Sequence, residues 1–163
     1  MNKLNFGCGK DIKQGWDNVD LQKGKEIFKS FDFNKHPYPL EESHYDLIYA
    51  NNVIEHLEQP EKAIYEFWRI SKKNAIIHLI VPYYNNKGAF NDMTHLHYFS
   101  DHTFIKFVEE PYTINKKRKF KIHSLTLNPT KIGKILPKKL REGLSLFIGG
   151  LIAHVDVKLK VIK

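Results

Sequence analysis

The chain opens with a short apolar segment that runs into a glycine turn, Lys3-Leu4-Asn5-Phe6-Gly7-Cys8-Gly9. We predict a strand over residues 3–7, because Leu4 and Phe6 are apolar and Gly7 begins the turn that ends it. Glycines have no side chain, so the backbone amides of such a turn can approach a ligand closely. The stretch therefore predicts a strand whose carboxyl end contacts a ligand.

Three further predicted strands also end on polar groups. They are residues 16–21 with Asp20, residues 29–33 with Asp32, and residues 45–50 followed by Asn51 and Asn52. In an open α/β sheet, ligands bind at the carboxyl ends of the strands. A carboxylate such as that of Asp20 can accept hydrogen bonds from both hydroxyls of a ribose. The glycine turn, the acids and the amide pair together predict a ligand that contains a nucleoside.

The rest of the chain alternates helices with strands. We predict helices from Pro60, from Ser100 and over residues 138–147, and strands over residues 75–81, 119–127 and 155–161. The last of these helices carries apolar residues at core spacing, namely Leu140, Leu144, Phe147 and Ile148. Because two of the strands are apolar on both faces, we predict an α/β fold in three layers with a mostly parallel sheet. The long loop over residues 84–99 is of a kind that is usually functional or disordered.

The composition is that of a single globular domain, which we assign to residues 1–163. The one cysteine, Cys8, excludes an internal disulfide. The N-terminus has no hydrophobic signal region, so we expect a soluble, cytoplasmic protein. Ten basic residues and no acidic one lie within residues 111–141. This segment predicts a surface that attracts phosphates, acidic lipid headgroups or anionic glycans, or else a merely solvated face.

These motifs resemble those of class I S-adenosylmethionine-dependent methyltransferases. The resemblance rests on residues 4–9, on Asp20, and on residues 45–57, which read Tyr-Asp-Leu-Ile-Tyr-Ala-Asn-Asn-Val-Ile-Glu-His-Leu. It implies a Rossmann-like methyltransferase sheet with an antiparallel C-terminal strand. It also implies an enzyme that transfers a methyl group, with S-adenosylmethionine as its cofactor.

The resemblance further implies a cofactor site at the strand ends. The methionine end of the cofactor would lie over Gly7 and Gly9, the ribose on Asp20, and the adenine near Asp32 and Phe33. Asn51 and Asn52 would lie beside the methyl group. The full set of implied cofactor residues is Phe6, Gly7, Cys8, Gly9, Asp20, Leu21, Asp32, Phe33, Asn51, Asn52 and His56.

The chain departs from the family pattern in its first half. Only residues 10–15 separate the glycine turn from the second predicted strand, and only residues 22–30 separate the second from the third. A parallel crossover normally needs a dozen or more residues and a helix. The helices after the first and second strands must therefore be shortened or missing. This leaves the edge of the sheet exposed, and we expect a homodimer partner or a folded-over loop to shield it.

Methyl transfer to a hydroxyl requires a group that takes the hydroxyl proton. Some small-molecule and sugar methyltransferases resemble the chain around His95, so we expect His95 to be this base or to orient the acceptor. Tyr98 would line the acceptor pocket. The alternative is that the histidines of this loop only pack within a lid. A metal site made of His95, His97, Asp92 and His102 has no fixed ligand set, so we expect no metal.

These features together predict methyl transfer to a small-molecule or glycan-type acceptor by O-methylation. Two alternatives stay open. The first is an RNA methyltransferase that uses the basic surface of residues 111–141, and the second is a catalytically silent cofactor-binding or scaffold domain. The basic segment, with the apolar residues 144–153 that follow it, is also suited to docking on an anionic membrane surface, which would place the protein peripherally at the membrane.

Overall fold

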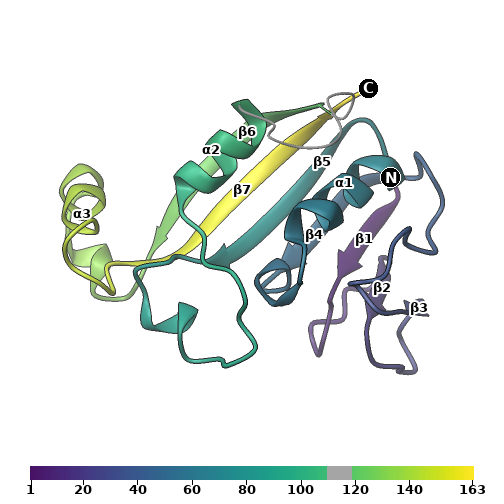
Figure 1. The fold of residues 1–163 in the computed structure, drawn as a ribbon, viewed down its shortest axis with the longest axis horizontal. Coiled ribbons are helices and arrows are strands. Elements are labelled where there is room, and N and C mark those ends of the chain that lie inside the picture. Colours follow the sequence, from purple (N-terminus) through teal and green to yellow (C-terminus); the bar gives the residue numbers. More distant parts are fainter. Residues whose placement is uncertain (110–118) are drawn as a thin grey trace.

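A seven-stranded sheet forms the centre of the molecule (Figure 1). The computed structural model describes residues 1–109 and 119–163. The strands are β1 (Lys3–Phe6), β2 (Asp17–Asp20), β3 (Lys29–Ser30), β4 (Tyr45–Asn51), β5 (Ser71–Pro82), β6 (Lys119–Pro129) and β7 (Ile152–Ile162). Their order across the sheet is β3-β2-β1-β4-β5-β7-β6. The order therefore sets β1 between β2 and β4, with the carboxyl ends of all three at one edge.

The sheet is parallel from β3 to β5 and antiparallel beyond it. β1 pairs in parallel with both β2 and β4, whereas β7 runs antiparallel to β5 and β6. This confirms the predicted α/β fold class, including its reversed C-terminal strand. The strand order changes direction between β1 and β4, which is where open α/β sheets bind their ligands.

The third strand is shorter than the predicted span of residues 29–33. It ends at Ser30, and the chain then turns its aromatic residues into the core. The ring of Phe33 stacks on that of Phe6 in β1 at a centroid distance of 3.9 Å, and Phe31 meets the same ring edge-on at 6.2 Å. Burial of these rings against β1 stabilises the fold. We infer that it outweighs the few additional strand pairs that a longer β3 would form at the exposed edge of the sheet.

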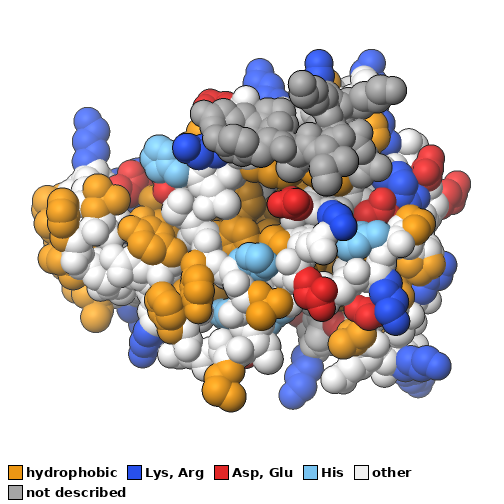
Figure 2. Space-filling model, in the orientation of Figure 1, with side chains coloured by type: hydrophobic (Ala, Val, Ile, Leu, Met, Phe, Trp, Pro, Cys, Tyr) orange, Lys and Arg blue, Asp and Glu red, His pale blue; other side chains and the backbone are white. Residues whose placement is uncertain are grey.

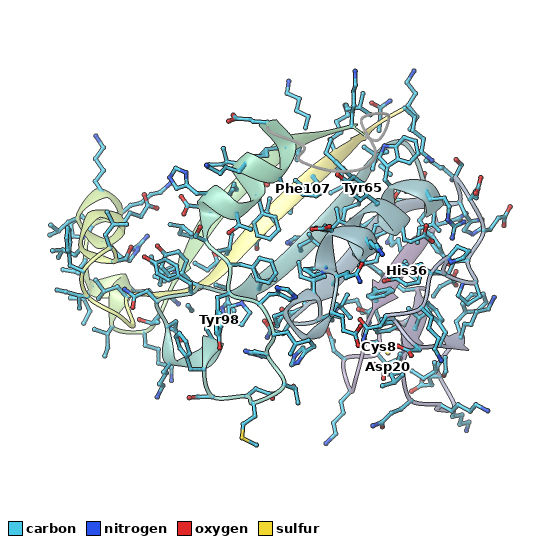
Figure 3. All side chains as sticks on the ribbon, in the orientation of Figure 1. Cys8, Asp20, His36, Tyr65, Tyr98 and Phe107 are labelled. Carbon is cyan, nitrogen blue, oxygen red and sulfur yellow. The ribbon has the colours of Figure 1, made fainter. Side chains whose placement is uncertain are left out.

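Two helices cover one face of the sheet. They are α1 (Pro60–Ile70) and α2 (Asp101–Glu109), and both lie in front of the strands in Figure 1. Pro60 begins α1 at a position that tolerates proline, and the hydroxyl of Ser100 caps α2 by accepting from the amide of Thr103 at 3.3 Å. The helices meet through Tyr65 and Phe107, whose ring centroids lie 5.6 Å apart (Figure 3).

The opposite face of the sheet is open. Among the described residues no helix packs against it, and the side chains of Tyr49, His78, Lys158 and Lys160 on this side are half-buried. Polar contacts take the place of a covering layer, because Nε2 of His78 lies 2.9 Å from Oδ1 of Asp156. The connections after β1 and β2 contain no helix, as predicted, so they cannot supply the second helical layer.

The helix over residues 138–147 differs from its prediction. α3 spans Lys138–Leu144 and has no buried residue. Leu140, Phe147 and Ile148, which have core spacing in the sequence, are 51%, 85% and 50% exposed. Their spacing marks an apolar helix face, but α3 lies at the far end of the molecule, beyond the sheet (Figure 1). Along the described residues, no helix has the length and apolar character needed to cross a membrane.

Candidate functional site

The glycine turn after β1 is tied to the end of β2. Gly7 and Gly9 have φ angles of +66° and +49°, a left-handed conformation that favours glycine. The amides of Gly7 and Cys8 both donate to the carbonyl of Val19, at 2.9 and 3.1 Å. The amide of Gly9 donates to Oδ2 of Asp20 at 2.8 Å. The turn and the acid therefore form one unit, which Figure 3 shows with Cys8 beside Asp20.

A cavity of about 420 Å³ opens beside this unit. Gly9 and Asp20 line it together with the loop over residues 22–27. A Cβ at Gly9 would meet nothing within 4 Å, so the backbone there is open to a ligand. Asp20 accepts from the amides of Gly9 and Gln22, which leaves further lone pairs on its carboxylate for hydroxyl donors. Leu21 is 63% exposed at the rim.

Phe33, which the resemblance places near the adenine together with Asp32, stacks on Phe6, another residue of the implied cofactor set. Phe6 is fully buried and Phe33 is 8% exposed, so the stacked pair belongs to the core beneath the strand ends. Asp32 is half-buried, and its Oδ1 accepts from the amide of Asn34 at 3.0 Å. The side chain of Asp32 thus remains at the surface, next to the rings rather than among them.

Cys8, Asn51 and Asn52 complete the strand ends. Cys8 is buried, and burial together with the nearby Asp20 carboxylate raises the pKa of its thiol. Asn52 has a φ of +52°, and its amide donates to the carbonyl of Ile80 at 2.9 Å. The side chains of both asparagines are exposed and have no recorded hydrogen bond among the described residues. They are available to a ligand at the carboxyl end of β4.

A second polar group forms where the loop between β5 and α2 crosses the end of β4. The short 3₁₀ helix η1 (Ile54–His56) follows β4, and the ring of His56 lies 4.6 Å from that of His95. Nδ1 of His95 lies 2.8 Å from the carbonyl of Ala89, and Nδ1 of His56 lies 2.8 Å from Oγ1 of Thr94. Sequence analysis named both histidines without predicting that they meet.

The residue that sequence analysis missed is Glu55. It is fully buried, and neither carboxylate oxygen has a hydrogen-bond partner among the described residues. Burial raises the pKa of Glu55 to about 7, although the nearby His95 lowers it. The available signal was the Glu-His pair inside the apolar run of residues 53–57, because a charged residue in such a run needs a local reason.

A second cavity lies beside the same loop. It has a volume of about 370 Å³ and is lined by Tyr83, Tyr84, Tyr98 and His102, among others. The ring of Tyr98 is 50% exposed and stacks on Phe90 at 4.8 Å (Figure 3). The aromatic walls are suited to a ring-shaped or glycan-type molecule. His97 of the loop and His102 of α2 do not join the group around Glu55.

The comparisons with known proteins agree with this geometry. Residues 8–79 match the family model described as a methyltransferase domain. This match covers less than half of the chain, and together with the fold it supports a class I S-adenosylmethionine-dependent methyltransferase. No curated protein gives a significant match.

Solved structures share this fold over nearly the whole length of the chain. A SAM-dependent methyltransferase from Archaeoglobus fulgidus is 15% identical, with a TM-score of 0.66 over 98% of this chain and 86% of that one. One from Mesorhizobium loti is 12% identical, with a TM-score of 0.65 over 98% and 90% of the chains. The [4+2]-cyclase SpnF is equally close, at 12% identity and a TM-score of 0.65 over 99% and 74% of the chains. At these identities the likeness is one of fold.

The family match and the solved structures imply S-adenosylmethionine as the cofactor. The residues at the strand ends fit it, because the open backbone at Gly9 and the unused lone pairs of Asp20 lie on one cavity. The assignment of single residues to parts of the cofactor remains a prediction.

Proposed function

We propose that this methyltransferase methylates a hydroxyl group of a small-molecule or glycan-type acceptor. The observation that carries the proposal is which ring nitrogen of His95 carries the proton. A carbonyl oxygen only accepts hydrogen bonds, so the 2.8 Å contact with Ala89 places the proton of His95 on Nδ1. Nε2 then carries a lone pair that can take a proton. This base belongs to the group around Glu55, next to the carboxyl end of β4.

The chain holds the cofactor, orients the acceptor and takes up the proton of the acceptor hydroxyl. When bound, S-adenosylmethionine would supply an electrophilic methyl group on its sulfonium sulfur and a neutral thioether as the leaving group, so the reaction would need no further co-reactant. Gly7, Gly9 and Asp20 hold the cofactor, and Asn51 and Asn52 flank the reacting end. The hydroxyl proton passes to Nε2 of His95.

The acceptor pocket is the hollow lined by Tyr83, Tyr84 and Tyr98. Tyrosine rings stack against apolar faces of sugars and aromatic rings, and their hydroxyls hydrogen-bond at the rim. Nothing in this pocket is basic except His102, which favours a neutral acceptor over a nucleic-acid backbone. The pocket size also suits a small acceptor.

The test is a turnover assay over a panel of hydroxyl acceptors, with release of S-adenosylhomocysteine as the readout. A sugar or phenolic acceptor should be turned over, and H95A should lose at least about 100-fold in kcat, the range expected for a general base. H97A, a histidine of the same loop that does not line this pocket, is the matched control and should keep most of the activity. Turnover on RNA alone would replace the proposal with the RNA alternative. Cofactor binding without turnover on any acceptor would favour a scaffold domain.

We also propose that the surface around α3 binds anionic lipid headgroups. Side chains of Ile132, Ile135, Leu146 and Phe147 are between 62% and 85% exposed. Hydrophobic side chains gather at the left of Figure 2, where Figure 1 shows α3. The same segment of the chain carries Lys131, Lys134, Lys138 and Lys139, with Glu142 as its acid. This pairing of apolar and cationic side chains is typical of helices that lie on membranes. Residues 110–118 of the basic segment lie outside the described residues.

Vesicle co-sedimentation tests this surface. The protein should sediment with vesicles that contain phosphatidylserine and not with neutral ones, and F147E should lose binding. F90E, on another exposed ring, serves as the matched control and should keep it. Binding to RNA with no binding to either kind of vesicle would overturn the proposal.

The proposed homodimer contact at the β3 edge is tested by sedimentation equilibrium. A mass equal to that of one chain would rule this contact out.

A further inference from the structure

Three potential metal ligands meet beside the end of β4. Glu55, His56 and His95 each offer one ligand atom, and these atoms all lie within 4.8 Å of one another. Two of the residues come from η1, and the third comes from the loop between β5 and α2. The set differs from the loop histidines and Asp92 that the sequence suggested as possible ligands, because it draws on two separate parts of the chain.

Glu55 is the unusual member of this group. Its side chain is fully buried, and both oxygens lack a hydrogen-bond partner among the described residues. Burying a carboxylate without a partner is costly, and buried charges are normally paired or coordinate metals. No Lys or Arg is recorded as an ion-pair partner of Glu55 among the described residues, whose salt bridges lie elsewhere. The two neighbouring histidine rings are what the carboxylate faces.

The hydrogen bonds around the two histidines leave Nε2 of each ring with a lone pair. Nδ1 of His95 donates to the carbonyl of Ala89. The hydroxyl of Thr94 has one proton, which it donates to Oδ1 of Asp92 at 2.7 Å. Oγ1 of Thr94 therefore accepts from Nδ1 of His56, at 2.8 Å. Metal-binding histidines are held in this way, with the second ring nitrogen donating to a carbonyl or to a hydrogen-bonded oxygen.

The loop that carries His95 is fixed over the site by the backbone. The carbonyl of Glu55 accepts from the amides of Leu96 and His97, at 2.8 and 3.2 Å. These bonds cross from η1 to the loop, so they set the position of His95 relative to Glu55. A ligand set that is fixed before the ion arrives binds with a smaller loss of conformational entropy.

We propose that Glu55, His56 and His95 bind a divalent transition-metal ion of the zinc class. Two imidazoles and one carboxylate are the ligands of open zinc sites, which keep a further position for water or substrate. Binding itself is independent of the proposed acceptor. Only one consequence rests on the O-methylation proposed above: with the ion bound, Nε2 of His95 would be a ligand in place of the base, and an acceptor hydroxyl at the open position would release its proton to solvent water because the ion would lower its pKa.

The experiment uses protein without a histidine tag, stripped with chelator and titrated with ZnCl₂ against a chromophoric competitor. We expect one ion per chain. E55Q and H95N should each weaken binding by more than about 100-fold, since loss of an outer partner alone costs about 10- to 100-fold. T94V should fall within that smaller range, because it removes the partner of His56. H97N is the matched control, a histidine of the same loop outside the group, and should bind as the wild type does.

A second measurement separates binding from folding. E55Q removes a buried charge that lacks a partner, so the variant should fold, and Zn²⁺ should raise the melting temperature of the wild type and H97N but not of E55Q. Absence of binding at one ion per chain, or equal binding by E55Q, H95N and wild type, would overturn the metal site. Turnover of a hydroxyl acceptor that chelator leaves unchanged would then still support the proposed function. Specific binding of Zn²⁺ without turnover of any hydroxyl acceptor would support the metal site and contradict only the proposed O-methylation.

Discussion

The backbone amide of Gly9 donates a 2.8 Å hydrogen bond to the carboxylate of Asp20, which joins the turn after β1 to the end of β2. The connection between these two strands contains no helix that could pack against them. This hydrogen bond therefore helps to hold the ends of β1 and β2 together. It also holds the carboxylate at the mouth of the cavity. The shortened half of the sheet therefore keeps the glycine turn and the acid together at one cavity.

We expect D20A to weaken binding of S-adenosylmethionine. The carboxylate offers charge-assisted acceptors to the ribose hydroxyls, each worth about 1.5–3 kcal/mol, so the dissociation constant should rise by about 10- to 150-fold. Calorimetric titration with S-adenosylmethionine and S-adenosylhomocysteine measures this. D11N, an exposed acid of the adjacent turn, is the control and should bind normally. Equal affinity in D20A and D11N would remove Asp20 from the site.

Gly7 should tolerate alanine less well than Gly15. Both have positive φ, at +66° and +73°, so a side chain at either costs about 1–2 kcal/mol. A Cβ at Gly7 would also lie 2.5 Å from Cγ2 of Val53, whereas one at Gly15 meets nothing within 4 Å. Chemical denaturation should show the larger loss of stability for G7A. The double variant G7A/V53A should lose less than the sum of its two single changes, and strict additivity would argue against the clash.

The ion pair of Glu66 and Arg69 should be a major source of stability. Glu66 is 6% exposed; its Oε2 lies 2.8 Å from Nη2 of Arg69 and accepts from the amide of Tyr38 at 2.9 Å. E66A leaves the half-buried guanidinium with only the exposed Glu42 as an ionic partner, and it should cost about 3 kcal/mol in the free energy of unfolding. Glu42, exposed and 3.6 Å from the same arginine, is the comparison. E42A should change stability by no more than about 0.5 kcal/mol.

Stability should fall at acid pH partly through His154. This residue of β7 lies between Pro82 of β5 and Asn128 of β6, and burial lowers its pKa below the ordinary 6.5. The unfolded chain therefore takes up the proton first, so the contribution is complete above pH 6.5 and is lost as the pH falls through the folded value. Denaturation at about pH 7.5 and about pH 5 should show a smaller loss for H154Q than for the wild type. H123Q, an exposed histidine of β6, should behave like the wild type.

Much of the sheet follows from local pattern. Val155, Val157, Leu159 and Val161 alternate with polar residues, and all four are fully buried in β7 as that alternation predicts. The glycine turn and Asp20 were predicted to lie at neighbouring strand ends, because parallel strands place their carboxyl ends on one edge. The missing helices followed from the short connections, which are counted directly from the sequence.

What escaped prediction depends on contacts far apart in the chain. Glu55 is buried because the amides of Leu96 and His97 bring a distant loop over it, and no local pattern encodes that approach. The apolar spacing of Leu140 and Phe147 predicts a helix with one apolar face, but it does not tell whether anything packs on that face. Phe33 reads as the end of a strand, whereas the aromatic cluster around Phe6 draws it into the core.

The short connections in the first half of the sheet have a consequence for the order of folding. Leu4 pairs with Asp17 and Val19 pairs with Lys29, so these parallel rungs join residues that are close in the chain. Pairs such as Ile76 with Lys160 instead join residues far apart in the chain, so they can form only after most of the chain is available. Because loop closure is easier for near residues, we expect pulse-labelled amide exchange to protect β1 and β2 early. During synthesis, the cofactor-holding rim can then take shape on the ribosome before the C-terminal strands that close the sheet have emerged.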